Sequence, residues 1–319
     1  MAAYGRRAAL AGAAVAWATR GMAAPWPDGP LKFIVPYPPG GASDAVLRLL
    51  QPHLAAALGG ATIVIENRGG GGTSIGTGAV ALARDGRTFG LTTDAISVNP
   101  VVMPDLPYDT LRDLAPVMLL GSAPLLLAVA PGQRPWRRFA DLLGLPRVTA
   151  GTSGAGLSNL FLALAAARTG ARLELVPYRG AGPLLNDALA GHVDLVVGTT
   201  SALGAALRGG QLLALAQAGA ARAALLPEVP TFAELGWPAV RAEVNWGIVT
   251  SARTPPAAVA AMHQALAAAL ALPAVRAALE ETLAMRVIAS TPAEYGAGIA
   301  ADIARWRELV AAQGIRLEP

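Results

Sequence analysis

Short apolar runs, several of them rich in β-branched residues, alternate with longer alanine- and leucine-rich stretches along most of the chain. Apolar runs of this length fit buried strands, and alanine and leucine favour helices. The alternation is typical of parallel βαβ units. We expect strands at residues 31–35, 62–66, 88–92, 125–130, 147–150, 173–177, 193–197 and 245–250. We expect helices at residues 43–58, 157–169, 181–190, 201–207 and 257–272, and a last helix after the capping box at residues 291–294.

The length of 319 residues allows two medium-sized domains, each with its own core. Two extended segments, residues 125–130 and 245–250, each join regions that resemble separate sets of strands and helices. Two such crossings predict a discontinuous two-domain fold. We expect one lobe at residues 25–127 plus 247–319 and a second lobe at residues 128–246.

The N-terminus has the pattern of a secretion signal over residues 1–24. Arg6 and Arg7 precede an apolar stretch, and small residues follow it near a cleavage site. The paired arginines leave both the general and the twin-arginine export routes open. Later apolar runs are interrupted before the ~20 residues of a spanning helix, so we expect a soluble mature chain in the periplasm.

The basic character of the chain comes mainly from this segment. Removing it takes three arginines and no acid, which lowers the formal net charge from +4 to about +1. The pI near 9.9 is therefore no sign of nucleic-acid binding. The sequence contains no cysteine, which excludes disulfides and thiol chemistry.

The loop at residues 36–44 is the most informative segment for function. It follows an expected strand and precedes a long helix, where ligands enter open α/β sheets. Gly40 and Gly41 allow the backbone to approach a ligand, and Ser43 or Asp44 can cap the helix. The N–H groups of a helix N-terminus bind anions without a cationic side chain. The alternative interpretation is an ordinary turn before a capped helix.

Residues 150–158 repeat this arrangement in the second expected lobe. Two helix N-termini would then face one cleft from opposite sides and suit a ligand with one or two carboxylates. Other hydroxyls, a tyrosine and an acid also follow expected strands. These residues are Thr93, Asp94, Tyr178, Thr199 and Thr200.

An enzyme has to be considered because residues 72–76 match the G-x-S-x-G pattern, with Ser74 as the nucleophile. Three further glycines separate this motif from its strand, whereas a nucleophile elbow turns sharply at the strand end. Its histidine partner would have to be His192 or His263. The single lysine, Lys32, follows no Walker A loop, and the three histidines lack metal-ligand spacing. We expect no metal and no cofactor.

Several segments taken together resemble the Bug-type receptors of tripartite tricarboxylate transporters over nearly the whole mature chain. They read IVPYPPGGASD, IVIENRGGGGTSIG, LPYDTLRDLAPV, LVPYRGAGPLLNDALAGHVDL, ALLPEVPTFAELG and, near the end, TPAEY. The resemblance implies a type II periplasmic-binding-protein fold. In this fold two α/β lobes are joined by a two-strand hinge, and the ligand cleft lies between them.

The function implied by the resemblance is that of a periplasmic solute-binding receptor. Such a receptor captures a small organic carboxylate, delivers it to integral membrane transporter subunits and performs no catalysis. We expect a monomer. The alternatives are a periplasmic serine hydrolase that uses Ser74 and a ligand-sensing module for a signalling partner; fold alone does not separate the last from a receptor.

Ligand contacts are carried over from the family by position. The first loop implies Tyr37, Gly40, Gly41, Ala42 and Ser43, the second lobe implies Thr152, Ser153 and Ser158, and further cleft residues are Ser74, Thr93, Asp94, Tyr178, Thr199 and Thr200. Asp94 and Ile96 replace small polar residues and a histidine, and Ser158 stands where a histidine is frequent. A carboxylate at Asp94 would repel a second acid group, so we predict a monocarboxylate or amino-acid-like ligand rather than citrate.

Overall fold

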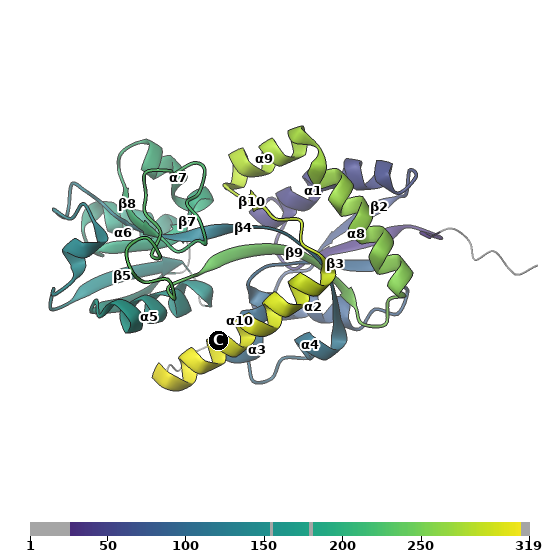
Figure 1. Cartoon of the computed structure of the whole chain (residues 1–319), viewed down its shortest axis with the longest axis horizontal. Coiled ribbons are helices and arrows are strands. Elements are labelled where there is room, and N and C mark those ends of the chain that lie inside the picture. Colours follow the sequence, from purple (N-terminus) through teal and green to yellow (C-terminus); the bar gives the residue numbers. More distant parts are fainter. Residues whose placement is uncertain (1–25, 154–155, 179–180, 314–319) are drawn as a thin grey trace, which may run out of the picture.

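The computed structural model describes residues 26–153, 156–178 and 181–313, so the predicted secretion signal lies outside the described residues (Figure 1). The strands are β1 (Leu31–Val35), β2 (Ile63–Asn67), β3 (Thr88–Thr92), β4 (Leu114–Val129), β5 (Val148–Ser153), β6 (Leu173–Tyr178), β7 (Leu195–Thr199), β8 (Leu213–Gln217), β9 (Glu243–Ser251) and β10 (Arg286–Val287). The α-helices are α1 (Ala42–Ala57), α2 (Ser74–Ala81), α3 (Ala95–Val102), α4 (Thr110–Asp113), α5 (Leu157–Thr169), α6 (Ala181–Ala190), α7 (Thr200–Arg208), α8 (Pro256–Ala271), α9 (Pro273–Leu283) and α10 (Pro292–Gln313).

The strands follow the order β2-β1-β3-β9-β4-β7-β5-β6, with β8 and β10 also paired to β4. Strand β1 is parallel to β2 and β3, and β5 is parallel to β6 and β7. The predicted parallel βαβ units are therefore confirmed in both halves of the molecule. Because of the parallel pairing, the loops that leave the strands gather at the carboxyl edge of each half.

Strands β4 and β9 connect the two halves. They pair antiparallel from Leu114 with Ser251 to Pro124 with Glu243. From Leu125 onwards β4 pairs instead with β7 and β8. A single long strand thus belongs to both halves, and the chain returns beside it through β9 (Figure 1). The two predicted crossing segments lie within these strands.

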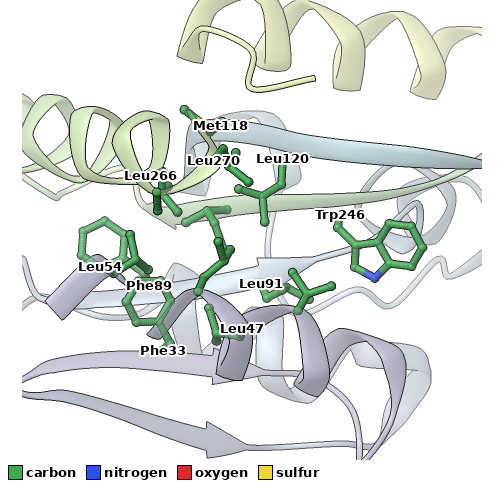
Figure 2. Packing of buried hydrophobic residues seen from close by; sticks show 14 of the residues in the cluster. Phe33, Leu47, Leu54, Phe89, Leu91, Met118, Leu120, Trp246, Leu266 and Leu270 are labelled. Carbon is green, nitrogen blue, oxygen red and sulfur yellow. The ribbon is translucent and has the colours of Figure 1, made fainter. Parts of the chain in front are cut away.

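Each half has its own apolar core. In the half that contains α1 and α8, Phe33 and Phe89 stack with ring centroids 5.5 Å apart, and Leu266 belongs to the same cluster (Figure 2). In the other half, the Phe232 ring meets Phe139 and Phe161 edge to face. Two separate cores define two lobes, as expected for a two-lobed binding protein.

Helix α10 forms a third connection between the lobes. Its first half places Tyr295, Ile299 and Ile303 in the core of the first lobe. Its second half places Trp306 and Leu309 in the core of the other lobe. Figure 1 shows the helix passing beneath the central strands from one lobe towards α5 of the other. Any rotation between the lobes must therefore also move α10 against one of them.

The sequence prediction missed the first half of β4. This segment contains Pro116, Gly121 and Pro124, residues that normally interrupt strands, and the pairing with β9 shifts register at the first two. The prediction also omitted β8, β10, α3 and α9. Within the described ranges, no single helix is long and apolar enough to cross a membrane; only α8 and α9 pass that test, taken together across a 78° bend.

Candidate functional site

The buried Asp44 carboxylate fixes the loop between β1 and α1 through hydrogen bonds. Helix α1 begins at Ala42, and its N-cap, Gly41, is extended and supplies no side-chain cap. The Asp44 carboxylate instead accepts hydrogen bonds from the Gly40 N–H at 3.0 Å, Arg48 Nε at 2.7 Å and Asn67 Nδ2 at 3.0 Å. The bond from Arg48, together with those from Gly40 and Asn67, lowers the pKa of Asp44 to about 2.

This arrangement differs from the predicted cap by Ser43 or Asp44. The first N–H groups of an α-helix have no intrahelical partner. Here the acid turns back to the preceding loop instead of covering them. The predicted contacts Gly40, Gly41 and Ala42 are all exposed at this helix start, whereas Ser43 is buried. The N–H groups of the first turn are thus left for another acceptor.

The glycine-rich segment between β2 and α2 packs against the loop between β1 and α1. A Cβ on Gly76 would lie 2.6 Å from the Arg68 carbonyl oxygen and 2.8 Å from Pro36 Cβ. A Cβ on Gly69 would lie 3.4 Å from Pro38 Cδ. Glycine therefore allows this loop to pack directly against the β1–α1 loop. Of the two glycines in the G-x-S-x-G match, Gly76 has this packing role, whereas a Cβ on Gly72 would meet only Met103 Sδ, at 3.7 Å.

Ser74 is the first residue of α2 and is buried. Neither candidate histidine partner contacts it in the described part of the chain. His263 Nε2 lies 3.1 Å from the Ser290 carbonyl oxygen, and His192 Nδ1 lies 3.4 Å from Asp187 Oδ1. The residues proposed for a hydrolase are therefore not brought together.

Tyr37 and Thr93 meet at the carboxyl ends of β1 and β3. The two hydroxyls are 2.6 Å apart, and Asn67 Nδ2 donates to the Tyr37 carbonyl oxygen at 3.1 Å. Burial raises the pKa of Tyr37, and the nearby Asp94 charge adds to this rise, whereas the bond to Thr93 opposes it. The Tyr37 hydroxyl therefore stays protonated and acts as a fixed neutral group.

The second lobe repeats the glycine-led helix start. Helix α5 follows Gly156, which has φ of 103° and gives no side-chain cap. The buried Thr152 hydroxyl donates to Asn159 Oδ1 at 2.8 Å and so joins the end of β5 to α5. Ser153 is the last residue of β5, and Ser158 is half-buried in the first turn of α5.

The hydroxyls of Tyr178 and Thr199 are used within the lobe. Tyr178 donates to Asp187 Oδ2 at 2.9 Å. Thr199 accepts from the Ala202 N–H at 3.3 Å and so caps α7. Thr200 is buried and lines a cavity formed wholly within the second lobe. All three side chains stand at carboxyl strand ends as predicted; the hydroxyls of Tyr178 and Thr199 bond within the lobe, whereas the Thr200 hydroxyl has no partner among the described residues.

Asp94 precedes α3 and lines a cavity of about 510 Å³ that both lobes and α10 enclose. Four arginines line the same cavity: Arg168, Arg241, Arg286 and Arg305. Burial, with a smaller contribution from the Asp302 charge, raises the pKa of Asp94 to about 7. Ile96 packs in the core of the first lobe, so it fills space there.

Sequence analysis overlooked Trp246 on β9. Its side chain is 3% exposed, and its Nε1 has no hydrogen-bond partner among the described residues. Gly247 pairs with Thr92, the last residue of β3, so Trp246 lies beside the position that Thr93 occupies next. In Figure 2, Trp246 lies beyond Leu47, on the side opposite Leu54, and therefore towards the start of α1. Trp246 lies in a predicted buried strand, where an apolar residue is expected, so the sequence did not mark it as a candidate site residue.

Carboxylates and imidazoles do not gather into a metal site. No group of three or more His, Asp or Glu residues in the described ranges could hold a metal ion. The candidate anion site instead comprises the uncapped N-termini of α1 and α5 and the hydroxyl pair of Tyr37 and Thr93. Such a site can hold an anion through hydrogen bonds, because N–H and O–H groups pair well with ionised oxygens.

Known proteins share the sequence pattern and the fold of this chain. The family model of the tripartite tricarboxylate transporter family receptor matches residues 46–315. Protein BugT of Bordetella pertussis is 34% identical over 315 residues, which cover 94% of this chain and 96% of BugT.

Among solved structures, a Rhodopseudomonas palustris protein with adipate superimposes with a TM-score of 0.77 at 30% identity, over 91% of this chain and 99% of that one. MatC from Rhodopseudomonas palustris with bound malate gives a TM-score of 0.73 at 27% identity, over 89% of this chain and 100% of that one. The periplasmic binding protein BugD gives 0.73 at 27% identity, over 91% of this chain and 99% of that one. These matches confirm the type II periplasmic-binding-protein fold and a solute-binding role. The chain therefore belongs to the receptor family of the tripartite tricarboxylate transporters.

Proposed function

We propose that this receptor holds a small organic carboxylate between the N-termini of α1 and α5. The observation that carries the proposal is the start of α1. Gly41 leaves the first turn without a side-chain cap, and Asp44 is turned back to Gly40 and Arg48. The positive end of the helix dipole and its N–H groups then stabilise a ligand carboxylate.

A dicarboxylate fits this site better than the monocarboxylate that the sequence suggested. Helix α5 begins after Gly156 without a side-chain cap, as α1 does after Gly41, so each lobe offers one helix N-terminus. The structural relatives with malate and adipate hold dicarboxylates. Near neutral pH Asp94 carries only part of a charge, since its pKa is about 7, and this weakens the expected repulsion of a second acid group.

Trp246 is proposed to supply a further donor on the side of the central strands. The strand register places Trp246 next to Thr93, and its buried indole N–H has no partner in the described part of the chain. Leaving such a donor unpaired costs about 1–3 kcal/mol. A carboxylate at the start of α1 would pair with it and remove that cost. Because Trp246 is on β9, the ligand would also contact the strand that joins the two lobes.

The wider role follows from the family. We propose a periplasmic, monomeric receptor that performs no catalysis and delivers its ligand to integral membrane transporter subunits. Lobe 1 would comprise residues 25–127 plus 247–319 and lobe 2 residues 128–246, with rotation about the segments where β4 and β9 pass between lobes. The Leu125 N–H donates to the Ala242 carbonyl oxygen at 3.0 Å at this crossing. Binding across both lobes gives a ligand the differential affinity needed to favour closure.

The test is a melting-temperature panel of malate, adipate, citrate and the uncharged diamide of adipate. A ligand at about 100 times Kd adds about 2.7 kcal/mol of stability, which raises the melting temperature by several degrees. We expect malate or adipate to stabilise the protein and the diamide to have no effect. A panel in which no carboxylate stabilises the protein would contradict the proposed ligand class.

Ala42→Pro tests the helix start directly. Proline is tolerated at the first helical position, and the extended Gly41 before it is compatible with proline, so this change removes one N–H with little effect on the fold. We expect binding at least about tenfold weaker, the loss of one charge-assisted hydrogen bond. Ala42→Ser keeps the N–H and should bind normally. Equal binding by both variants would exclude this N–H from the site.

A further inference from the structure

The second lobe contains a cavity of about 700 Å³ along β8, apart from the proposed carboxylate site. Its walls come from α7, from the chain before and within Phe139–Leu142, and from residues 225–230. We call it the β8 cavity. Its size lies within the range of small-molecule sites, and its lining is mainly apolar, including Phe139, Leu215 and Val229.

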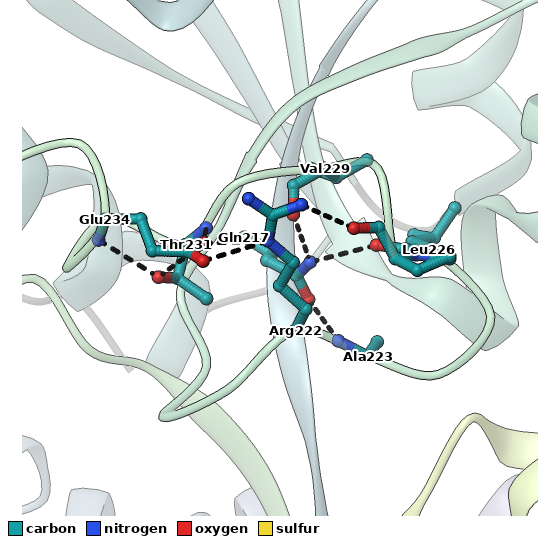
Figure 3. Close-up of polar contacts among 8 residues, drawn as sticks. Gln217, Arg222, Ala223, Leu226, Val229, Thr231 and Glu234 are labelled. Atoms are coloured by element: carbon teal, nitrogen blue, oxygen red, sulfur yellow. Dashed lines mark hydrogen bonds and ion pairs between the residues drawn. The ribbon is translucent and has the colours of Figure 1, made fainter.

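A polar network fixes one wall of the β8 cavity in place. Gln217, at the end of β8, is fully buried, and its Nε2 donates to the carbonyl oxygens of Leu226 at 3.2 Å and Val229 at 2.6 Å (Figure 3). Its Oε1 accepts from the Ala223 N–H at 2.7 Å. Leu226 and Val229 both line the cavity. The wall is therefore a built structure, and a ligand would meet it already formed.

One buried hydroxyl in the cavity lining forms no hydrogen bond with the described residues. Thr200 is 5% exposed and lines the β8 cavity, and its Oγ1 has no hydrogen-bond partner in the described part of the chain. A buried hydroxyl without a partner costs about 1–3 kcal/mol, and native structures rarely keep one. The Oγ1 atom is almost fully covered, so a bound molecule would bond with it once the Thr200 side chain rotates towards the cavity.

The charged groups around the cavity are mainly cationic. Arg137, Arg138 and Arg208 line it, against the single carboxylate of Glu228. Arg208 makes no ion pair with any described residue, and the Arg138 pair with Asp141 spans 3.5 Å at an exposed position. A ligand that combines an apolar body with an anionic head would use both the walls and these guanidinium groups.

We propose that the β8 cavity is a second binding site, for an amphipathic organic anion with a compact apolar body and one acidic group. This site is independent of the carboxylate site between the lobes. A mainly apolar lining with exposed arginines beside it fits a small amphipathic anion better than a protein surface.

The experiment is calorimetric titration of octanoate into the mature protein and four variants of it. Gly204→Leu places a larger side chain in the cavity from α7. A Cβ at this position meets only the flexible Arg208 guanidinium, at 3.2 Å. Leucine is also a better helix former than glycine. Ala205→Leu adds the same side chain at an exposed position of the same helix and is its matched control. Thr200→Val removes only the unpaired hydroxyl, and Trp246→Phe alters the other site.

We expect Gly204→Leu to weaken octanoate binding at least about tenfold and Thr200→Val by about three- to tenfold, the loss of one hydrogen bond. Ala205→Leu and Trp246→Phe should bind octanoate normally, and octanol should bind far more weakly than octanoate. Binding that is lost in Trp246→Phe but kept in Gly204→Leu would overturn the proposal, as would no octanoate binding at all. Melting curves of each variant check that Gly204→Leu is folded.

Discussion

Asp94 couples stability to pH near neutrality. Its pKa is about 7 in the folded chain, because it is buried and faces the Asp302 charge, and about 3.8 otherwise. The folded state therefore holds a proton that the unfolded state has released between these values. Stability contributed by the protonated form is complete below about pH 4 and is lost as pH rises to about 7.

Asp94→Asn should remove this dependence. We expect the variant to be more stable than the native chain at pH 8, by roughly 1–3 kcal/mol, and the difference to close as pH falls to 4.5. Urea midpoints at pH 8, 6 and 4.5 measure it. A stability difference that stays constant with pH would show that Asp94 does not titrate in this range. Glu308→Gln, at an exposed position of α10, serves as the control.

The Trp246 indole reports whether the ligand reaches the central strands. On addition of a stabilising carboxylate, we expect its indole proton resonance to move downfield, as a new charge-assisted bond forms. The Trp26 indole already donates to the Gly86 carbonyl oxygen at 3.2 Å, so its resonance should stay in place. Trp246→Phe assigns the signal and should weaken binding about tenfold. Stabilisation by the ligand with an unmoved Trp246 signal would remove this residue from the site while leaving the receptor function intact.

For single residues, the sequence predicted which side chains follow the strands but not which hydrogen bonds they form. The order of strand, glycines and helix predicted Gly40 and Gly41 as ligand contacts, and the family resemblance added Tyr37; all three stay predictions. It did not show that Asp44 bonds Gly40 or that Thr152 bonds Asn159, since each choice depends on which neighbour the fold brings within reach. Thr200 was predicted from its place at a strand end, whereas Trp246 stands out only because its indole N–H has no partner among the described residues, which no sequence pattern encodes.

A substitution in α2 tests whether close packing at a glycine positions the β1–α1 loop. Gly76→Ala would push a Cβ to 2.6 Å from the Arg68 carbonyl oxygen and 2.8 Å from Pro36. The backbone atoms there cannot swing aside, so the β1–α1 loop must shift. We expect a loss of stability of about 1–3 kcal/mol and weaker ligand binding.

Gly78→Ala in the same helix is the matched control. A Cβ there meets Tyr108 Cδ1 at 3.5 Å, an ordinary contact, and alanine favours the helix by up to about 1 kcal/mol. This variant should bind normally and melt at the same or a higher temperature. Chemical denaturation and the ligand panel measure both effects. If Gly76→Ala behaved like Gly78→Ala, the two loops would not depend on close packing.

Several elements that lie within one lobe followed from the sequence pattern, although α3, β8 and α9 did not. Strands β1 and β3 and helices α5 and α6 have the predicted bounds. The prediction was incomplete for β4, where Pro116 and Gly121 are accommodated at register shifts against β9. A strand that is stabilised by pairing across two lobes tolerates residues that local propensity would exclude.

For the whole molecule, the two cores and the shared strands determine how it can move. Each lobe is packed internally, whereas β4, β9 and α10 pass between lobes. The Arg305 Nη1 donates to the Arg241 carbonyl oxygen at 2.8 Å, so α10 is attached to the chain entering β9. These connections favour a hinge rotation near Leu125 and Ala242 over independent lobe motion.

The absence of cysteine from the sequence allows this hinge to be measured with two introduced spin labels. Ala57 at the end of α1 and Ala167 in α5 are both exposed and lie on different lobes. Closure on a carboxylate should turn a broad distance distribution between them into a narrower, shorter one, since the ligand favours one member of an open and closed ensemble. A second pair, at Ala57 and the exposed Ala277, lies within one lobe and should not change. An unchanged distribution for the first pair in saturating ligand would mean that binding does not close the lobes, and recognition by a membrane partner would then have to depend on the ligand site itself.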